Sequence, residues 1–176
     1  MRTNLSRCIL AGLGLMLSYQ AQAATTGTIE STLTLTAACQ VNGSSASSGA
    51  DFGTLDFGTH DALFNTADGQ VIGGGGGAIS ILCSAGTVPV IRVGAGSHDG
   101  QSAGGSRALA DGVGNFVPYD FYTDAGRTQV LAINGTITLP LSSGVAQTVN
   151  LYGQARGKVG LPAGEYTDTV SVELSF

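Results

Sequence analysis

Two cysteines are the residues of this sequence with the clearest chemistry. Cys39 and Cys83 could form a disulfide or help to hold a metal ion. A zinc site would need further Cys or His ligands at short spacing, and His60 and His98 do not supply them. An exported chain with two cysteines most simply joins them in one disulfide, so we predict a Cys39–Cys83 bond with Cα atoms within about 7 Å.

Three other motifs suggest chemistry more weakly. His98-Asp99 lies in a polar, Gly-rich segment without a third partner, which favours a solvated turn over a catalytic or metal pair. Residues 111–115 lack the ligand spacing and closing Glu of a calcium loop. The five glycines 73–77 have no following Lys-Ser or Lys-Thr, so they indicate a flexible tether rather than a phosphate loop. The sequence therefore predicts no catalytic residues, no metal site, no cofactor and no enzyme.

The first 23 residues have the features of a cleavable export signal. Arg2 and Arg7 precede an apolar run from Ile9 to Leu17, which is too short to span a bilayer. A small-residue Ala-Gln-Ala site follows, so the mature chain is expected to begin at Ala24 and to contain 153 of the 176 residues. Cys8 would be removed with the signal. Five basic and 12 acidic residues then remain, and a formal charge of −7 argues against binding to nucleic acid or anionic membranes.

Composition and periodicity of the mature chain indicate a single all-β domain. Only 11% of the residues of the full sequence are charged and 28 of its 176 residues are Gly, and no stretch of the mature chain has the apolar period of an amphipathic helix. Short runs of strand-forming residues recur between Gly-, Ser- and Asp-rich turns, which is typical of a sandwich or barrel. These predicted strands are Ala78–Cys83, Val88–Val93, Asn115–Thr123, Thr136–Leu141, Thr148–Gly153 and Thr169–Phe176.

Two segments between the cysteines are expected to be irregular. Residues 42–50 are predicted to form a polar loop, and residues 59–77 a long connection. Between them, Phe52 and Phe57 are five positions apart and would lie on opposite faces of a regular strand. The neighbouring glycines are therefore expected to mark a bulge or bend that turns both rings inward.

The first strongly alternating segment of the mature chain is residues 28–36. Ile29, Ser31, Leu33 and Leu35 would share one face of a strand, and the opposite face would be wholly polar. This pattern fits either the first strand of an ordinary sandwich or a strand that completes a sheet in another molecule.

The last segment, residues 168–176, alternates in the same way. Val170, Val172, Leu174 and Phe176 would share one face of a strand. The sequence given stops on this strand, so nothing after it could supply a further neighbour. We therefore expect a two-layer antiparallel sandwich that lacks an edge strand next to residues 168–176.

In their joint order these features resemble the spore coat protein U domain family, which includes the pilin subunits of archaic chaperone–usher pili. The resemblance covers nearly the whole mature chain. Its parts are the alternating strand before Cys39, Phe57-Gly58, Cys83 after Ile-Ser-Ile-Leu, the run Tyr119-Asp120-Phe121-Tyr122-Thr123-Asp124 with Arg127, Gly153-Gln154, Gly164-Glu165-Tyr166-Thr167-Asp168, and the alternating ending.

The resemblance implies an incomplete immunoglobulin-like antiparallel β-sandwich that is completed by a donor strand. Residues 24–38 would be the donor extension and residues 39–176 the sandwich domain, with Ile29, Ser31, Leu33 and Leu35 entering the groove of a neighbouring subunit. The partners implied are identical or related pilins, a periplasmic chaperone and an outer-membrane usher. The protein would be a pilus subunit exported through the periplasm to the cell surface, where it supports adhesion and biofilm formation.

Two other functions remain open at this stage. A secreted binding sandwich would use residues 28–36 as a strand of its own sheet. A small outer-membrane β-barrel would share the terminal Phe, although no Trp and five Tyr would make thin aromatic girdles. Ser31 also departs from the large apolar residue expected of a donor strand at that position.

Overall fold

The computed structural model describes residues 24–176, which contain β-strands and no helix. The expected export signal, residues 1–23, lies outside the described residues. The chain divides into two units, one ending at Thr34 and the other comprising Leu35–Phe176. In the part of the chain that is described, no helix is long and apolar enough to cross a membrane.

The segment before Cys39 belongs to no sheet in the single chain. Residues 24–38 have no strand assignment, and Ile29, Leu33 and Leu35 are 94%, 83% and 83% exposed. The alternating segment 28–36 therefore does not serve as a strand of its own domain here, although its sequence pattern is that of a strand.

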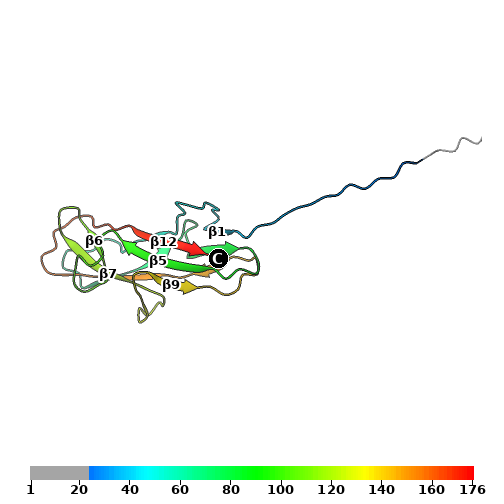
Figure 1. The fold of residues 1–176 in the computed structure, drawn as a ribbon. Helices are drawn as coiled ribbons and strands as arrows, with labels where there is room; N and C mark the ends of the chain where they lie inside the picture. Colours follow the sequence, from blue (N-terminus) through cyan, green and yellow to red (C-terminus); the bar gives the residue numbers. More distant parts are fainter. Residues whose placement is uncertain (1–23) are drawn as a thin grey trace, which may run out of the picture. The chain divides into compact units, whose positions relative to one another are not determined.

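Residues 39–176 form twelve short strands in three antiparallel sheets (Figure 1). One sheet has the order β1-β4-β10, a second has the order β2-β3-β11-β7-β6 with β8 also on β7, and a third has the order β12-β5-β9. The bounds are β1 Cys39–Val41, β2 Thr54–Leu55, β3 Thr66–Ile72, β4 Ile79–Cys83, β5 Val90–Gly96, β6 Arg107–Ala110, β7 Phe116–Tyr122, β8 Val130–Leu131, β9 Gly135–Thr138, β10 Gln147–Val149, β11 Tyr152–Arg156 and β12 Val170–Ser175.

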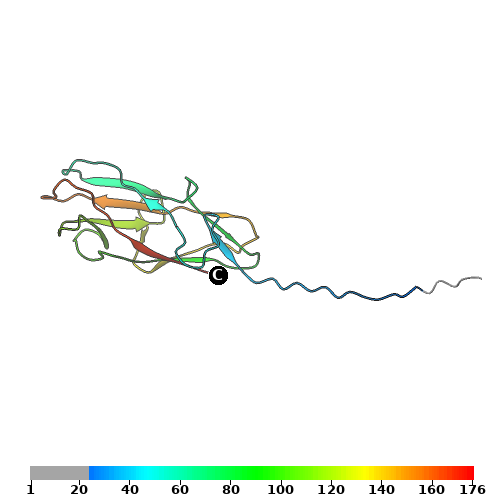
Figure 2. The same cartoon turned by 90° about the horizontal axis from the view of Figure 1, so that it is seen from above.

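The sheets enclose one apolar core, which confirms the predicted all-β sandwich-like fold. Figure 2 shows β3, β11 and β7 side by side, and β12 in a different layer. Inward-facing residues alternate with exposed ones, as in β4, where Ile79, Ile81 and Cys83 are buried. The fully buried members come from all three sheets and include Val71, Ile79, Ile81, Ile91, Val93, Val117, Phe121, Leu131 and Val149.

The predicted disulfide is present between adjacent strands. Cys39 of β1 and Cys83 of β4 are directly opposite each other in the ladder, with Cα atoms 4.0 Å apart. Val41 and Ser44 then exchange backbone bonds of 2.9 Å around Asn42 and Gly43, both of which have positive φ. The Asn-Gly pair thus begins the predicted 42–50 loop with a tight turn.

The long connection predicted over residues 59–77 is wrong, because β3 lies within it. β3 has the sequence TADGQVI, whose Asp-Gly pair disfavours a strand locally. Pairing with β2 on one side and β11 on the other overrides that preference. The glycine run is a tight turn rather than a flexible tether, since Gly73 and Gly77 are joined by a backbone bond of 2.6 Å.

The predicted strand 148–153 is in fact two strands of different sheets. β10 ends at Val149 and pairs with β4, whereas β11 begins at Tyr152 and pairs with β3 and β7. The chain changes sheets at residues 150–151, which periodicity alone does not reveal. The other strands predicted within residues 78–176 are present with shifted ends, and the short strands β1, β6 and β8 were not predicted.

Candidate functional site

The C-terminal strand β12 has a partner on one edge only. β5 pairs with it, and within residues 24–176 no strand pairs with its other edge (Figure 1). Val170, Val172 and Leu174 face inward and are half-buried, while Phe176 follows the strand and is 54% exposed. The backbone along this edge is therefore available to pair with a further strand.

Backbone contacts identify which residues of the C-terminal segment face the open edge. Thr167 exchanges two bonds of 2.9 Å with Ala110, and the carbonyl of Thr169 accepts a bond from the Ser97 N–H. Because backbone groups alternate in direction along a strand, those of Asp168 and Val170 face the other, unpaired edge.

Two adjoining cavities lie beside this edge and form a groove. The smaller, about 400 Å³, opens over core residues such as Ile79, Ile91 and Val149 and is bordered by Val170 and Val172. The larger, about 1020 Å³, lies between residues 54–64 and 161–168. The residues that line both are Thr54, Leu55, Phe57, Leu109 and Asp168. We call this shared position the waist of the groove.

Residues 50–57 line the groove together with the β12 segment, and we call them the lip. Asn42 links the lip to β4. The amide of Asn42 donates to the Asp51 carbonyl at 2.8 Å, while its Oδ1 accepts from the Ser80 N–H at 2.9 Å. Gly53 has a φ of 118°, and a Cβ there would lie 2.3 Å from the Ile72 carbonyl oxygen. Only glycine permits this approach, so the lip packs directly on β3.

A notch made by two glycines receives the side chain of Leu55. Gly69 of β3 and Gly153 of β11 are opposite each other in the ladder. A Cβ at either would lie 2.7 or 2.4 Å from a methyl carbon of Leu55. Phe57, next along the lip, packs edge-on against Tyr119 at a centroid distance of 5.8 Å. Phe52 and Phe57 both pack on the core, so the predicted inward bend is confirmed.

A polar cluster lies at the waist, below the apolar walls. Asp168 accepts a bond from the Tyr119 hydroxyl at 2.8 Å and another from the Ser97 N–H at 2.9 Å, and its side chain is 1% exposed. Burial, and then the bond to Asp168, raise the pKa of Tyr119 far above its usual value, so the hydroxyl keeps its proton and donates it. His98 lies 3.3 Å from the same carboxylate.

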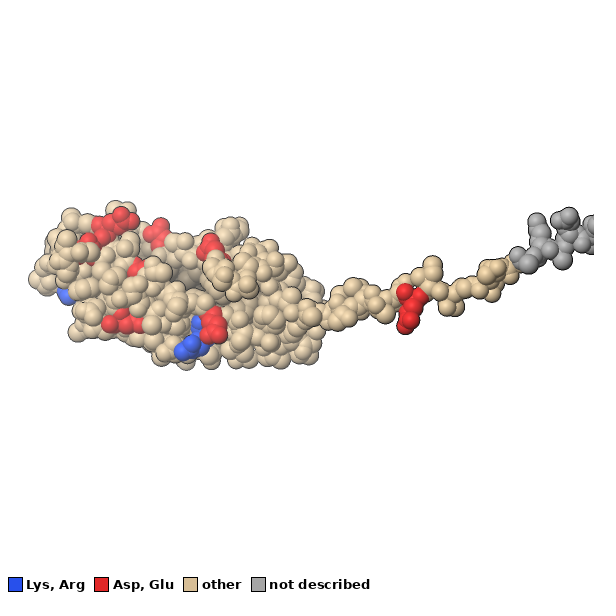
Figure 3. Space-filling view, turned by 45° about the horizontal axis from the view of Figure 1, so that its top comes forward, with Lys and Arg blue, Asp and Glu red and all other residues tan. Residues whose placement is uncertain are grey.

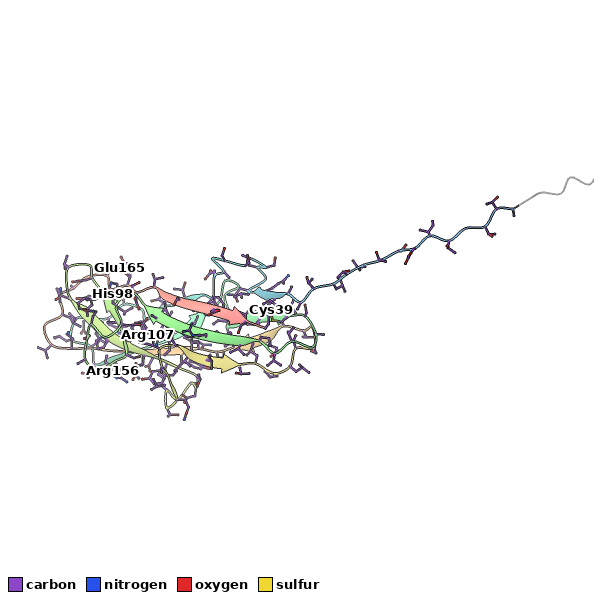
Figure 4. All side chains as sticks on the ribbon, viewed as in Figure 1. Cys39, His98, Arg107, Arg156 and Glu165 are labelled. Carbon is purple, nitrogen blue, oxygen red and sulfur yellow. A yellow bond between two sulfur atoms is a disulfide. The ribbon has the colours of Figure 1, made fainter. Side chains whose placement is uncertain are left out.

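Arg107 of β6, which is directly opposite Tyr119 of β7 in the ladder, completes this cluster. Its side chain is fully buried, donates to the Gly94 carbonyl of β5 at 2.8 Å and stacks on Phe121 at 5.1 Å. Burial lowers the pKa of Arg107, and nearby charges, including that of Asp99, oppose the shift. We call Arg107, Tyr119, Asp99 and Asp168 the waist cluster. Figure 4 places Arg107 and His98 far along the domain from Cys39.

The prediction of a solvated turn at His98-Asp99 is only partly correct. Residues 97–100 do form a turn, but Asp99 accepts a bond from the Gly96 N–H at 3.0 Å, and its other carboxylate oxygen is buried. Among the described residues no group of three His, Cys, Asp or Glu side chains could hold a metal ion. The turn therefore packs beside Asp168, whose carboxylate lies 3.3 Å from His98 Nδ1.

Several residues of the Tyr119–Arg127 run hold this site together. Asp124 accepts bonds from the backbone of Thr128 and Gln129, at 3.0 and 2.7 Å, and so closes the turn after β7. Arg127 donates to the Gly153 carbonyl at 3.1 Å, which fixes the back of the glycine notch. The sequence pattern alone does not reveal that Asp124 closes this turn and that Arg127 supports the notch.

The structure brings together some of the predicted site residues and adds others. Val170 and Val172 border the groove, whereas Ile29, Ser31, Leu33 and Leu35 are exposed on the unpaired segment. Sequence reasoning did not assign Tyr119, Asp168 or Arg107 to the site, although the first two lie in quoted motifs. The surface in Figure 3 is largely uncharged, and its acidic side chains outnumber the basic ones.

This domain is an antiparallel β-sandwich with one disulfide, and its C-terminal strand is paired on one edge only. The sequence profile of the Spore Coat Protein U domain matches residues 25–173, and the chain belongs to that family. The chain is 29% identical over 177 residues to Protein U of Myxococcus xanthus, covering 96% of this chain and 94% of that protein.

Among solved structures, the chain matches the CsuC–CsuE chaperone–tip adhesion subunit pre-assembly complex from archaic chaperone–usher Csu pili of Acinetobacter baumannii. The match has a TM-score of 0.48 and 17% identity, and it covers 81% of this chain. This chain spans 41% of the chain it matches there.

Proposed function

We propose that this protein is a structural subunit of a chaperone–usher surface pilus, and that it polymerises by donor-strand exchange. The observation that carries the proposal is the unpaired edge of β12 beside an apolar groove. The groove of one subunit receives residues 28–36 of another, with Ile29, Ser31, Leu33 and Leu35 facing inward. Residues 24–38 are then the donor extension and residues 39–176 the acceptor domain.

The energetics of an open sandwich support this assignment. Backbone groups at an unpaired, partly buried edge are costly, and an added strand pairs them while covering the apolar walls. Burying Ile29, Leu33 and Leu35 would contribute about 1.5–3 kcal/mol each. Their exposure in the single chain means that this gain is available only on association. Head-to-tail donation does not close on itself and so extends into a fibre.

Export and assembly require partners of defined kinds. A periplasmic chaperone covers the groove before assembly, and an outer-membrane usher passes subunits to the cell surface, where the pilus supports adhesion and biofilm formation. Identical or related subunits donate the final strand. The similarity to a chaperone–subunit complex is consistent with these partners, and the family relationship supports export.

The decisive experiment changes adjacent residues of the donor segment. Leu33→Asp places a carboxylate in an apolar groove, where it must be buried unpaired or take up a proton, and either is costly. Thr32→Asp, one residue earlier, points to the opposite face and should matter little. The measurement is the heat- and detergent-resistant oligomer ladder of each variant in the producing cells.

We expect Leu33→Asp to abolish the ladder and Thr32→Asp to retain it. Subunit levels in the periplasm, measured in parallel, show that each variant is made and exported. Equal ladders from Leu33→Asp and the unchanged protein would refute donation by residues 28–36.

A further inference from the structure

We propose that the Cys39–Cys83 disulfide carries the tension of the fibre and keeps that tension away from the lip of the subunit's own groove. This inference rests on the proposed donor-strand function and adds to it a mechanical role for the disulfide. In a fibre joined head to tail by donor strands, each subunit is pulled at two places. One is the start of its domain at Cys39, and the other is the groove that holds its neighbour's strand.

The donor extension leaves the domain at the disulfide itself. Cys39 is the first residue of β1, and its Cα lies 4.0 Å from that of Cys83. Just before it, Ala38 donates its N–H to Ser84 Oγ at 2.9 Å, and its carbonyl accepts the Ser84 N–H at 2.9 Å. Without the disulfide, tension on the extension would act on these few hydrogen bonds and then on β1. Within residues 24–176, β1 is an edge strand of three residues that pairs with β4 alone, so little would hold it in place.

The disulfide offers tension a much shorter route to the groove than the backbone does. Residues 84–89 join Cys83 to β5, and β5 pairs with β12, whose open edge borders the groove. β4 ends at Cys83, lies between β1 and β10, and is anchored in the core by Ile79 and Ile81. The backbone route runs instead through residues 40–82, which include the lip. The disulfide therefore takes the lip out of the path of tension.

The lip needs this protection because it is held by the residue that follows β1. β1 ends at Val41, and the backbone N–H of Asn42 donates to the Ser80 carbonyl at 2.8 Å. The side-chain amide of Asn42 donates to the Asp51 carbonyl of the lip at 2.8 Å, and its Oδ1 accepts the Ser80 N–H at 2.9 Å. If β1 were pulled from β4, Asn42 would move with it and these bonds would break. The lip would lose its link to β4, and the groove would lose the support of one wall.

This arrangement predicts that the disulfide matters most when the fibre is under tension. At rest, β1 stays paired with β4, and Asn42 holds the lip whether or not the sulfur atoms are bonded. Under tension, a subunit with reduced cysteines should lose β1 and then its lip, and it should release its neighbour's strand. A disulfide that only stabilised the folded domain against unfolding would affect the joint equally in both conditions.

The test pulls single fibres, detached from the producing cells, at constant force in an optical trap before and after reduction by dithiothreitol. Reduction after assembly avoids any effect of a missing bond on folding, and labelling of the freed thiols shows that it is complete. We expect reduction to shorten the lifetime of the joint about tenfold under tension, as the loss of one or two hydrogen bonds would. Dissociation of the detergent-resistant ladder without tension should hardly change.

The order of events under tension gives a second readout. The cysteines are 44 positions apart in the sequence, so the segment between them can lengthen by up to about 150 Å once the bond is reduced. In reduced fibres, lengthening of this segment should come before the joint opens. In fibres with the disulfide intact, it should not occur before the joint opens.

Variants of two asparagines test whether the disulfide acts through the lip. Asn42 and Asn134 both have positive φ, which glycine also adopts, and the side chain of each links two segments of the chain. Asn42→Gly should shorten the lifetime of the joint even with the disulfide intact, and reduction should then add little, because the lip is already released. Asn134→Gly, the matched control, removes a bond from Arg92 and should behave as the unchanged protein does. A full effect of reduction in Asn42→Gly would overturn the link through the lip.

The outcomes distinguish the mechanical role from the proposed function. Equal shortening of the joint lifetime with and without tension, or no shortening, overturns the mechanical role and leaves donor-strand exchange standing. Opening of the joint in reduced fibres before the segment between the cysteines lengthens also overturns it. Absence of any detergent-resistant ladder from the unchanged protein overturns the proposed function, and the mechanical role with it.

Discussion

The domain contains two polar clusters, each with an arginine, a tyrosine and at least one aspartate, and they differ in how completely their polar atoms are hydrogen-bonded. We call Asp120, Ser106, Tyr122 and Arg156 the closed cluster. Asp120 accepts two bonds of 2.7 Å from Ser106 and one of 2.8 Å from Arg156. Arg156 also donates to the Tyr122 hydroxyl at 2.9 Å and to the Gly104 carbonyl.

The waist cluster lacks a direct pair between its arginine and a carboxylate. Arg107 donates to backbone carbonyls, and the described residues offer its Nε no partner. Asp99 Oδ1 is unpaired in the same sense. A buried polar atom without a partner costs about 1–3 kcal/mol. The waist cluster is therefore less completely hydrogen-bonded than the closed cluster.

The difference corresponds to the strands around each cluster. The closed cluster is built on β7 and β11, which have neighbours on both sides. The waist cluster is bounded by β12, which has one. Two of the buried atoms without partners among the described residues, Arg107 Nε and Asp99 Oδ1, therefore belong to the cluster next to the half-paired strand, and a further strand would pair with the open backbone edge of β12.

The largest effect that tests this comparison is expected from Arg107→Ala. The side chain is fully buried, and its loss leaves a cavity and removes the donors to three carbonyls. We expect the free energy of unfolding of the purified protein to fall by about 3–5 kcal/mol, measured by denaturant titration.

Arg156→Ala is the matched control in the closed cluster. Its side chain is 37% exposed, so water can replace part of what is lost. If Arg156→Ala lowered the unfolding free energy as much as Arg107→Ala or more, the closed cluster would stabilise the domain more than the waist cluster, which would contradict the comparison.

Much of this fold could be predicted from residue patterns, because alternation and cysteine count act locally. The half-buried face of β12 and the Cys39–Cys83 bond followed from such rules. β3 could not be predicted, because its Asp68-Gly69 pair is unfavourable in an isolated strand. Gly69 is tolerated there because Leu55 fills the space above it, which is a contact between distant parts of the chain.

In the candidate site, too, local patterns could be predicted from the sequence and contacts between distant residues could not. That Val170 and Val172 share one face of a strand could be predicted from their spacing alone. The role of Asp168 could not, because it depends on Tyr119, 49 residues away in the sequence and in the facing sheet.

A smaller effect is expected from removing single hydroxyl groups. Tyr119→Phe deletes the bond to Asp168 and leaves a nearly buried carboxylate oxygen unpaired, so we expect a loss of about 1–3 kcal/mol in unfolding free energy. Tyr122→Phe removes an acceptor from Arg156, which keeps its other partners, and should cost less. Equal losses in denaturant titrations of the two variants would contradict the comparison.

The smallest expected effect is on how the unfolding free energy changes with acid, through Asp120 of the closed cluster. Burial alone would raise the pKa of Asp120, but the bonds from Ser106 and Arg156 outweigh it, so the pKa of this carboxyl is lowered on folding. A lowered pKa stabilises the fold fully above the unfolded value of about 3.9 and ceases to do so as the pH falls toward the folded value.

We therefore expect Asp120→Asn to flatten the decline of unfolding free energy on acidification below about pH 4, measured by denaturant titration across that range. The amount lost should be below about 1 kcal/mol, because Arg156 is partly exposed and solvent screens its charge. Ser106→Ala, which removes one of the bonds that lower the pKa, should flatten the decline in part. An acid decline as steep in Asp120→Asn as in the unchanged protein would assign that decline to other carboxylates and remove Asp120 as a source of acid sensitivity.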